Sequence, residues 1–112
     1  MERREFARVA VELPLSLSGN GMAGGGLISG LSARGCTLVS DELILPGTTL
    51  ALRIQLPTQS VPLKVDLAEV RWAQGRECGL EFLRLRLEEK KRLRRFLSAL
   101  QRAQGGGFQQ TG

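Results

Sequence analysis

The sequence predicts a mainly β fold, a small antiparallel barrel of about six strands followed by a C-terminal α-helix. Three observations support this class. Apolar and polar residues alternate over several short segments before Phe82, which is typical of strands with one buried face. Glycine or proline separates these segments. After Leu87 the apolar spacing changes to a helical period of about 3.6 residues.

Length and composition limit the chain to one small domain. With 112 residues, of which 42% are hydrophobic, it can bury one compact core but has no room for a second domain. The net charge of +5 permits an anionic partner without identifying one. Charged residues directly follow the first methionine, and no apolar run approaches membrane-spanning length. We therefore expect a cytoplasmic protein with no signal peptide and no membrane insertion.

Catalytic and metal chemistry find little support in the composition. The chain has no histidine, which removes the most common general base and histidine-based metal sites. Cys36 and Cys78 are too few for a disulfide framework and lack the spacing of a metal site, so we expect two buried free thiols. No serine or cysteine has a visible base partner. We expect neither an enzyme nor a bound metal or cofactor.

The first half of the chain contains three predicted strands. The clearest runs from Val9 to Leu17, where the large apolar residues stand at every second position. The glycine-rich segment from Gly19 to Gly26 is expected to be a flexible connection. A phosphate-binding loop is the alternative there, but neither a lysine nor a helical pattern follows it. Residues 27–40 predict two short strands separated at residues 30–35.

Two further strands are predicted at residues 50–56 and 78–82, each with apolar residues at every second position. Residues 41–47 supply a turn before the first of them. Residues 74–76 predict a hairpin turn before the second.

The remaining strand, predicted at residues 61–72, contains an irregularity. Its apolar residues stand at odd positions as far as Leu67 and at even positions from Ala68 onward. An unbroken strand cannot move its side chains from one face to the other. We therefore predict a bulge or sharp bend near residues 67–69.

A helix is predicted from Leu87 to Gln104, with one narrow apolar face. That face consists of Leu93, Phe96, Leu97 and Leu100. Residues 86–102 contain seven Lys or Arg and two Glu, so the other faces are basic. We expect the basic surface either to be solvated or to contact an acidic protein partner, and not to read duplex DNA. Residues 105–112 show no pattern and are predicted to be a disordered tail.

An arginine-rich arm, residues 1–8, precedes the barrel and helix predicted for residues 9–104. Arg3, Arg4 and Arg8 each carry a planar fork of donors that matches a phosphate or the edge of a guanine. An ordinary charged terminus is the alternative. If the arm binds a ligand, residues 1–7 should be mobile without it and ordered with it.

Four segments together resemble one protein family. Residues 3–8, RREFAR, resemble the RRxxxR motif that opens PilZ domains, the bacterial receptors for cyclic di-GMP. Residues 30–35, GLSARG, are similar to the second motif of that family, (D/N)xSxxG. Residues 70–72 and 78–82, VRW and CGLEF, resemble the region around the last strand of the family. The resemblance implies a six-stranded antiparallel PilZ-like barrel with a C-terminal α-helix.

The resemblance also implies a ligand site. Its candidate residues are Arg3, Arg4, Arg8, Gly30, Ser32, Gly35 and Trp72. The arginines would grip phosphate and guanine, the second motif would form the floor of the site, and Trp72 would offer a ring face to a base. For Ser32 and Gly35 the alternative is a tight connection between strands, and for Trp72 it is core packing.

One residue departs from the family pattern. Gly30 stands where the family has Asp or Asn, so a side chain that could bond to guanine is missing. The resemblance implies a cyclic di-GMP receptor whose arginine arm closes over the nucleotide to regulate a protein effector. The alternative is a degenerate PilZ protein that acts only through protein contacts. A nucleic-acid binder is disfavoured, because four Phe, one Trp and no Tyr leave little material for a stacking platform.

Overall fold

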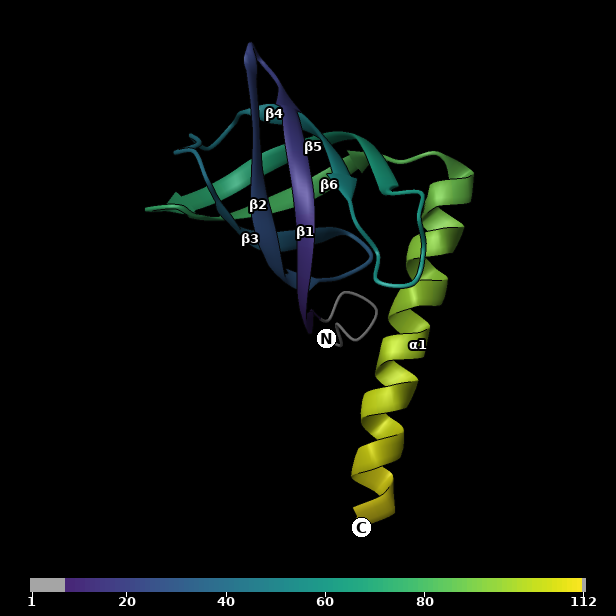
Figure 1. Cartoon of the computed structure of the whole chain (residues 1–112). Coiled ribbons are helices and arrows are strands. Elements are labelled where there is room, and N and C mark those ends of the chain that lie inside the picture. Colours follow the sequence, from purple (N-terminus) through teal and green to yellow (C-terminus); the bar gives the residue numbers. More distant parts are fainter. Residues whose placement is uncertain (1–7, 112) are drawn as a thin grey trace.

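The computed structural model of the chain describes residues 8–111 and shows a closed antiparallel barrel with a C-terminal helix (Figure 1). The strands close in the order β1-β2-β3-β6-β5-β4. The elements are β1 (Val9–Gly19), β2 (Met22–Leu31), β3 (Gly35–Ser40), β4 (Thr49–Ile54), β5 (Leu63–Gln74), β6 (Glu77–Arg84) and α1 (Leu87–Thr111). The predicted fold class and the number of strands are confirmed.

The core lies inside the barrel and is built from the alternating residues of every strand. In β1, Leu13, Leu15 and Leu17 point inward and are at most 6% exposed, while their neighbours face solvent. Cys36 and Cys78 belong to the same core as free thiols, as the sequence predicts. Burial raises the pKa of the Cys36 thiol to about 12, so this cysteine stays neutral and unreactive.

The glycine-rich segment is a strand and not the flexible connection that its composition suggests. Only the Asn20-Gly21 pair forms the turn, with positive φ values of 51° and 74°, as a tight two-residue hairpin requires. β2 then starts at Met22 and pairs with β1 along its length. Glycine is needed at residue 26, because an added Cβ would lie 2.5 Å from the carbonyl oxygen of Val39 on β3.

The predicted bulge in β5 is confirmed, and a second irregularity follows it. The pairing of β5 with β6 shifts between Leu67 and Ala68, where the buried positions change from odd to even. The pairing shifts again between Val70 and Trp72, so Arg71 is an extra residue without a partner in the β6 register. As a result, Arg71 and Trp72 are both exposed although they are neighbours in one strand.

Helix α1 packs on the barrel through the predicted apolar face. Leu93 and Leu97 are buried, and Phe96 and Leu100 pack against the core while partly exposed. Arg92 fastens the helix to the β4–β5 loop, since its guanidinium donates to the carbonyl oxygens of Val61 at 2.6 Å and Pro62 at 3.2 Å.

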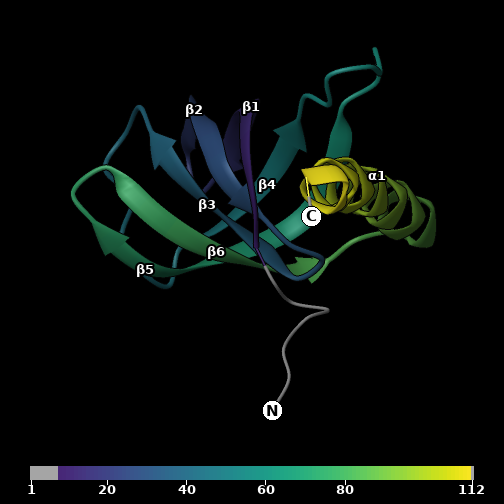
Figure 2. The ribbon, with the colours of Figure 1, turned by 90° about the horizontal axis from the view of Figure 1, so that it is seen from below.

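The C-terminal half of α1 extends away from the barrel (Figures 1 and 2). The helix continues to Thr111, which corrects both the predicted end at Gln104 and the disordered tail predicted from Gly105. Glycines weaken a helix but keep the backbone N–H groups that continue its hydrogen bonds, and no proline interrupts the segment. Over the described residues, no helix combines the length and apolar character needed to cross a bilayer.

Candidate functional site

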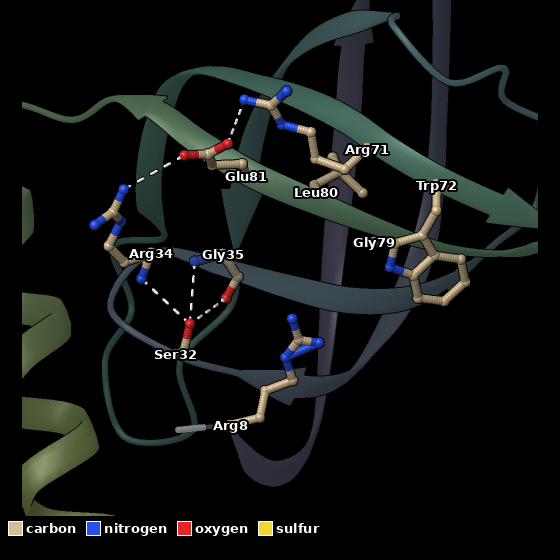
Figure 3. A pocket seen from close by; sticks show the side chains of 9 residues that line it. All are labelled: Arg8, Ser32, Arg34, Gly35, Arg71, Trp72, Gly79, Leu80 and Glu81. Carbon is tan, nitrogen blue, oxygen red and sulfur yellow. Dashed lines mark hydrogen bonds and ion pairs between the residues drawn. The ribbon is translucent and has the colours of Figure 1, made fainter. Parts of the chain in front are cut away.

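An open cavity of about 240 Å³ lies where the start of β1 meets the β2–β3 loop and the β5–β6 pair (Figure 3). It is lined by Arg8, Ser32, Arg34, Gly35, Arg71, Trp72, Gly79, Leu80 and Glu81. Four of the predicted site residues, Arg8, Ser32, Gly35 and Trp72, therefore meet at one place, although they come from three separate segments of the sequence. Arg3 and Arg4 lie outside the described residues, as do the rest of the predicted mobile arm.

Arg8 and Trp72 face the cavity from different parts of the barrel, the start of β1 and the end of β5 (Figure 3). Arg8 directly precedes β1, and among the side chains that the structure describes it has no ion-pair partner. Its five N–H donors are thus available to an anion or to the acceptor edge of a guanine. Trp72 is 39% exposed, so its core-packing alternative is wrong. A cationic fork and an aromatic ring on one cavity suit a ligand that contains both phosphate and a planar base.

Gly30 does not line the cavity but lies beneath Arg8. A Cβ at Gly30 would lie 3.0 Å from Cδ of Arg8 and 2.8 Å from Oγ1 of Thr37, its partner on β3. Gly30 is not among the residues with positive φ, so its backbone would accept another residue. The space that a side chain would need is taken by Arg8 and Thr37.

Ser32 organises the loop between β2 and β3. Its hydroxyl accepts hydrogen bonds from the backbone N–H groups of Arg34 and Gly35, both at 3.2 Å, and donates to the carbonyl oxygen of Gly35 at 3.3 Å. These three bonds use its single donor and both of its acceptor positions. The turn is closed by a further bond of 2.9 Å between the backbone N–H of Ser32 and the carbonyl oxygen of Gly35. Ser32 therefore shapes the floor of the cavity. Its hydrogen bonds support the alternative interpretation, in which this residue forms a tight connection between strands.

Gly35 is a close-approach position for another strand. A Cβ there would overlap the carbonyl oxygen of Leu80 and lie 3.3 Å from the Cα of Glu81. Gly35 pairs with Glu81 at the start of the β3–β6 ladder. The glycine of the second motif is thus required by the packing of β3 on β6, whether or not it also approaches a ligand.

Gly79 positions Trp72. The two residues are partners in the β5–β6 register, and the indole covers the Cα of the glycine (Figure 3). A Cβ at Gly79 would overlap Nε1 of Trp72 and lie 2.6 Å from its Cε2. Because one side of the ring is held against the strand, the exposed remainder forms a rigid platform.

Gly79→Ala should therefore lift the indole from β6 and remove the platform. We expect the fluorescence of Trp72, the single tryptophan, to shift as its contact with the strand is lost. We also expect binding of a planar base to weaken by about fivefold to tenfold, the loss of one stacking contact. Gly24→Ala, in β2, is the matched control, since its Cβ would meet only Cγ of Glu42 at 3.2 Å. Fluorescence and affinity equal to those of Gly24→Ala would contradict the role of Gly79.

Three charged residues of the cavity were not predicted from the sequence. Glu81 on β6 forms ion pairs with Arg71 of β5 and, at 3.6 Å, with Arg34 of the β2–β3 loop. Arg71 also lies 3.7 Å from Glu69. Arg34 precedes Gly35 and Arg71 precedes Trp72 in the sequence. This position beside a predicted site residue is the only sign in the sequence that the two arginines line the cavity. Their convergence on Glu81 depends on the register of three strands.

The functional groups of the cavity are of kinds that bind anions and aromatic rings. Within the described part of the chain, no group of three or more His, Cys, Asp or Glu side chains could hold a metal ion. Besides the carboxylate of Glu81, the cavity presents arginine forks, backbone groups and an indole ring. This set recognises anions and aromatic rings by hydrogen bonding and stacking.

Comparisons with known proteins identify a family and structures of similar fold. The family model described as PilZ domain matches residues 2–99. MotI/DgrA, the inhibitor of motility of Bacillus subtilis, is similar in structure with a TM-score of 0.70 and 22% identity. That match covers 94% of this chain and 53% of MotI/DgrA, so the chain spans about half of its length.

A second solved structure is similar over its whole length. The PilZ domain of CeSA from a cellulose-synthesising bacterium has a TM-score of 0.62 and 15% identity, with 85% of this chain and 98% of that domain covered. At such identities both structures support the fold alone. No curated protein matches the chain. The family model spans the whole barrel and the first half of α1, and the chain therefore belongs to the PilZ domain family.

Proposed function

We propose that this chain is a receptor for cyclic di-GMP that passes the signal to a protein effector. PilZ domains are regulatory binding domains and generally cyclic di-GMP receptors. The observation that supports the function here is the meeting of Arg8, Trp72 and the second motif at one cavity. These residues come from separate segments. Barrel packing does not require an arginine without an ion pair to any described side chain and an exposed tryptophan to face the same space.

The chemistry of the ligand matches the cavity. Cyclic di-GMP presents phosphates, which accept hydrogen bonds from arginine, and guanines, whose O6 and N7 atoms match a guanidinium fork. A guanine ring can also stack on an indole. Arg8 supplies the fork and Trp72 the ring, while the loop held by Ser32 supplies the floor.

The position of Arg8 also gives the arm its proposed role. Arg8 connects the arm to β1 at the rim of the cavity, so Arg3 and Arg4 lie only a few residues away along the chain. We propose that this arm closes over the nucleotide, with Arg4 and Arg3 adding contacts to those of Arg8. The closed arm would create the surface that an effector recognises.

The names of the structural neighbours suggest kinds of effector. One neighbour is an inhibitor of motility, and the other is the PilZ domain of CeSA from a cellulose-synthesising bacterium. For this chain we propose an acidic protein effector, because α1 carries exposed cations with no ion-pair partner among the described side chains. They are Lys90, Lys91, Arg94, Arg95 and Arg102.

The second candidate function is a degenerate PilZ adaptor that binds no nucleotide. Gly30 is the observation that favours it, since the side chain that the family uses there is missing. The surrounding atoms sharpen this alternative, because Thr37 and Arg8 occupy the space that a side chain at residue 30 would need. The absence of Asp or Asn at residue 30 is thus accompanied by neighbours that fill the space of its side chain.

Isothermal titration calorimetry with cyclic di-GMP tests the proposed function. We expect saturable binding by the full chain, and no comparable binding of GMP, which lacks the second guanine. Absence of heat with cyclic di-GMP, in a protein that is folded by circular dichroism, would support the adaptor instead.

Gly30→Asp tests why the chain departs from the family pattern. Alone, the change should gain little affinity, because the new Cβ meets Thr37 and the stem of Arg8. Combined with Thr37→Ala, which removes the Oγ1 atom, it should tighten binding by about twofold to tenfold, the worth of one added hydrogen bond. Thr37→Ala alone is the control, and calorimetry measures the cycle. Equal affinities for all four proteins would show that residue 30 makes no contact with the ligand.

A further inference from the structure

The cavity already contains an anion of its own, the carboxylate of Glu81. This residue stands between buried Leu80 and Phe82 on β6, so its side chain is directed outward, toward the cavity. One carboxylate oxygen contacts Arg71 and the other lies 3.6 Å from Arg34 (Figure 3). Of the described arginines that line the cavity, Arg34 and Arg71 are thus held by the same carboxylate.

The strand register explains why Glu81 holds both of them. Glu81 pairs with Gly35 on β3 and with Glu69 on β5, so it lies at the centre of three neighbouring strands. Glu69 and Glu81 are carboxylates on directly opposite residues, an arrangement that is unfavourable without a cation. Arg71, the extra residue of the second β5 irregularity, contacts both carboxylates and offsets this repulsion.

The two arginines remain within reach of a ligand. The side chains of Arg34 and Arg71 are 58% and 50% exposed, whereas that of Glu81 is 31% exposed. Ion pairs at such exposure contribute little to folding stability. Exchanging the carboxylate of Glu81 for another anion therefore costs little free energy. A phosphate in the cavity would compete with Glu81 for the same planar forks.

We propose that Glu81 acts as a resident anion that occupies Arg34 and Arg71 in the ligand-free domain and yields them to a phosphate of the nucleotide. The inference rests on the proposed function, and it makes Glu81 a positioning residue that limits affinity. Arg8, unpaired among the described side chains, would make the first contact with the ligand. Arg34 and Arg71 would join it once they exchange Glu81 for phosphate.

Glu81→Gln distinguishes this role from a purely structural one, in which the ion pairs of Glu81 only hold neighbouring elements together. The amide keeps the size of the side chain and one acceptor oxygen but removes the competing charge. We expect cyclic di-GMP to bind about threefold to tenfold more tightly, and its affinity to fall more steeply with added salt, because more arginine charges then face the ligand. If Glu81 were purely structural, the variant would bind the ligand equally well or more weakly, because the loss of its ion pairs would loosen the cavity.

Glu42→Gln is the charge-matched control. Glu42 lies near Gly24, at the opposite end of β2 from Gly30. Its replacement therefore makes the same change in net charge without altering a residue that lines the cavity. Inorganic pyrophosphate provides a second probe that needs no guanine. Tighter binding of both probes by Glu81→Gln than by Glu42→Gln supports the inference, and equal or weaker binding of both overturns it.

The two probes also distinguish the inference from the proposed function. If neither wild type nor Glu81→Gln binds cyclic di-GMP, the proposed function fails, and the inference is then decided by pyrophosphate alone. If Glu81→Gln does not fold, Arg34→Gln in the wild-type background replaces it. Weaker binding by that variant supports a phosphate contact at Arg34, whereas unchanged binding of both probes contradicts it.

Discussion

Replacing Arg8 with alanine should weaken cyclic di-GMP binding by about 10-fold to 100-fold, the equivalent of one or two charge-assisted hydrogen bonds. Arg8 is the cavity arginine that has no competing carboxylate among the described side chains, so its loss removes the donor fork that is most available to the ligand. Because Arg8 is exposed and precedes the first core strand, the melting temperature should hardly change. Calorimetry and a thermal melt measure the two quantities.

Two further variants test whether the effect of Arg8→Ala comes from the guanidinium of this residue or from net charge alone. Arg8→Lys keeps the charge but loses the planar fork, so it should recover only part of the affinity if a guanine edge or a bidentate phosphate contact is involved. Arg53→Ala removes an exposed arginine of β4, which does not line the cavity, and should bind like wild type. Equal loss in Arg53→Ala and Arg8→Ala would mean that only net charge matters and would contradict the assignment of Arg8.

Replacing Gly35 with alanine should destabilise the domain by about 2–3 kcal/mol, the upper range for overpacking a closely packed site. The added Cβ overlaps the backbone of Leu80, which cannot move without separating β3 from β6. For a domain of about this size, the melting temperature should fall by roughly 10 °C. Thermal and urea unfolding measure the change.

Gly24→Ala is again the matched control, because Gly24 also lies inside a strand and its Cβ meets only a flexible side chain. It should change stability by less than about 1 kcal/mol, since alanine also reduces the freedom of the unfolded chain. A Gly35→Ala variant as stable as Gly24→Ala would show that β3 and β6 can separate at low cost. In that case the glycine of the second motif would have to be explained by the ligand.

Much of the fold was predictable because strand and helix periods are local properties. The alternation in β1, the change of face near Leu67 and the apolar face of α1 follow from the side-chain directions of strands and helices. The first half of β2 was missed because three successive glycines carry no period at all. Its strand state depends on pairing with β1 and β3, and the Asn20-Gly21 turn was the local signal for that hairpin.

Part of the membership of the candidate site was predictable, but the roles of its residues were not. The motifs identify Arg8, Ser32, Gly35 and Trp72, and all four line the cavity. The sequence could not show that the hydroxyl of Ser32 is used within its own turn, because that depends on the loop geometry. Nor could it show which of the many arginines would share Glu81, because ion pairs join residues that are distant in the chain.

By itself, the sequence determined the class of fold, the order of the elements, the free thiols in the core and the family of the domain. Each of these follows from periodicity, composition or short motifs, which are written along the chain. The tertiary structure alone decided that Gly79 lies beneath Trp72, that Gly35 lies against Leu80 and that Glu81 lies between Arg34 and Arg71. These contacts depend on the register of β3, β5 and β6 and on the second irregularity of β5, where a shift of one residue would place every side chain on the other face.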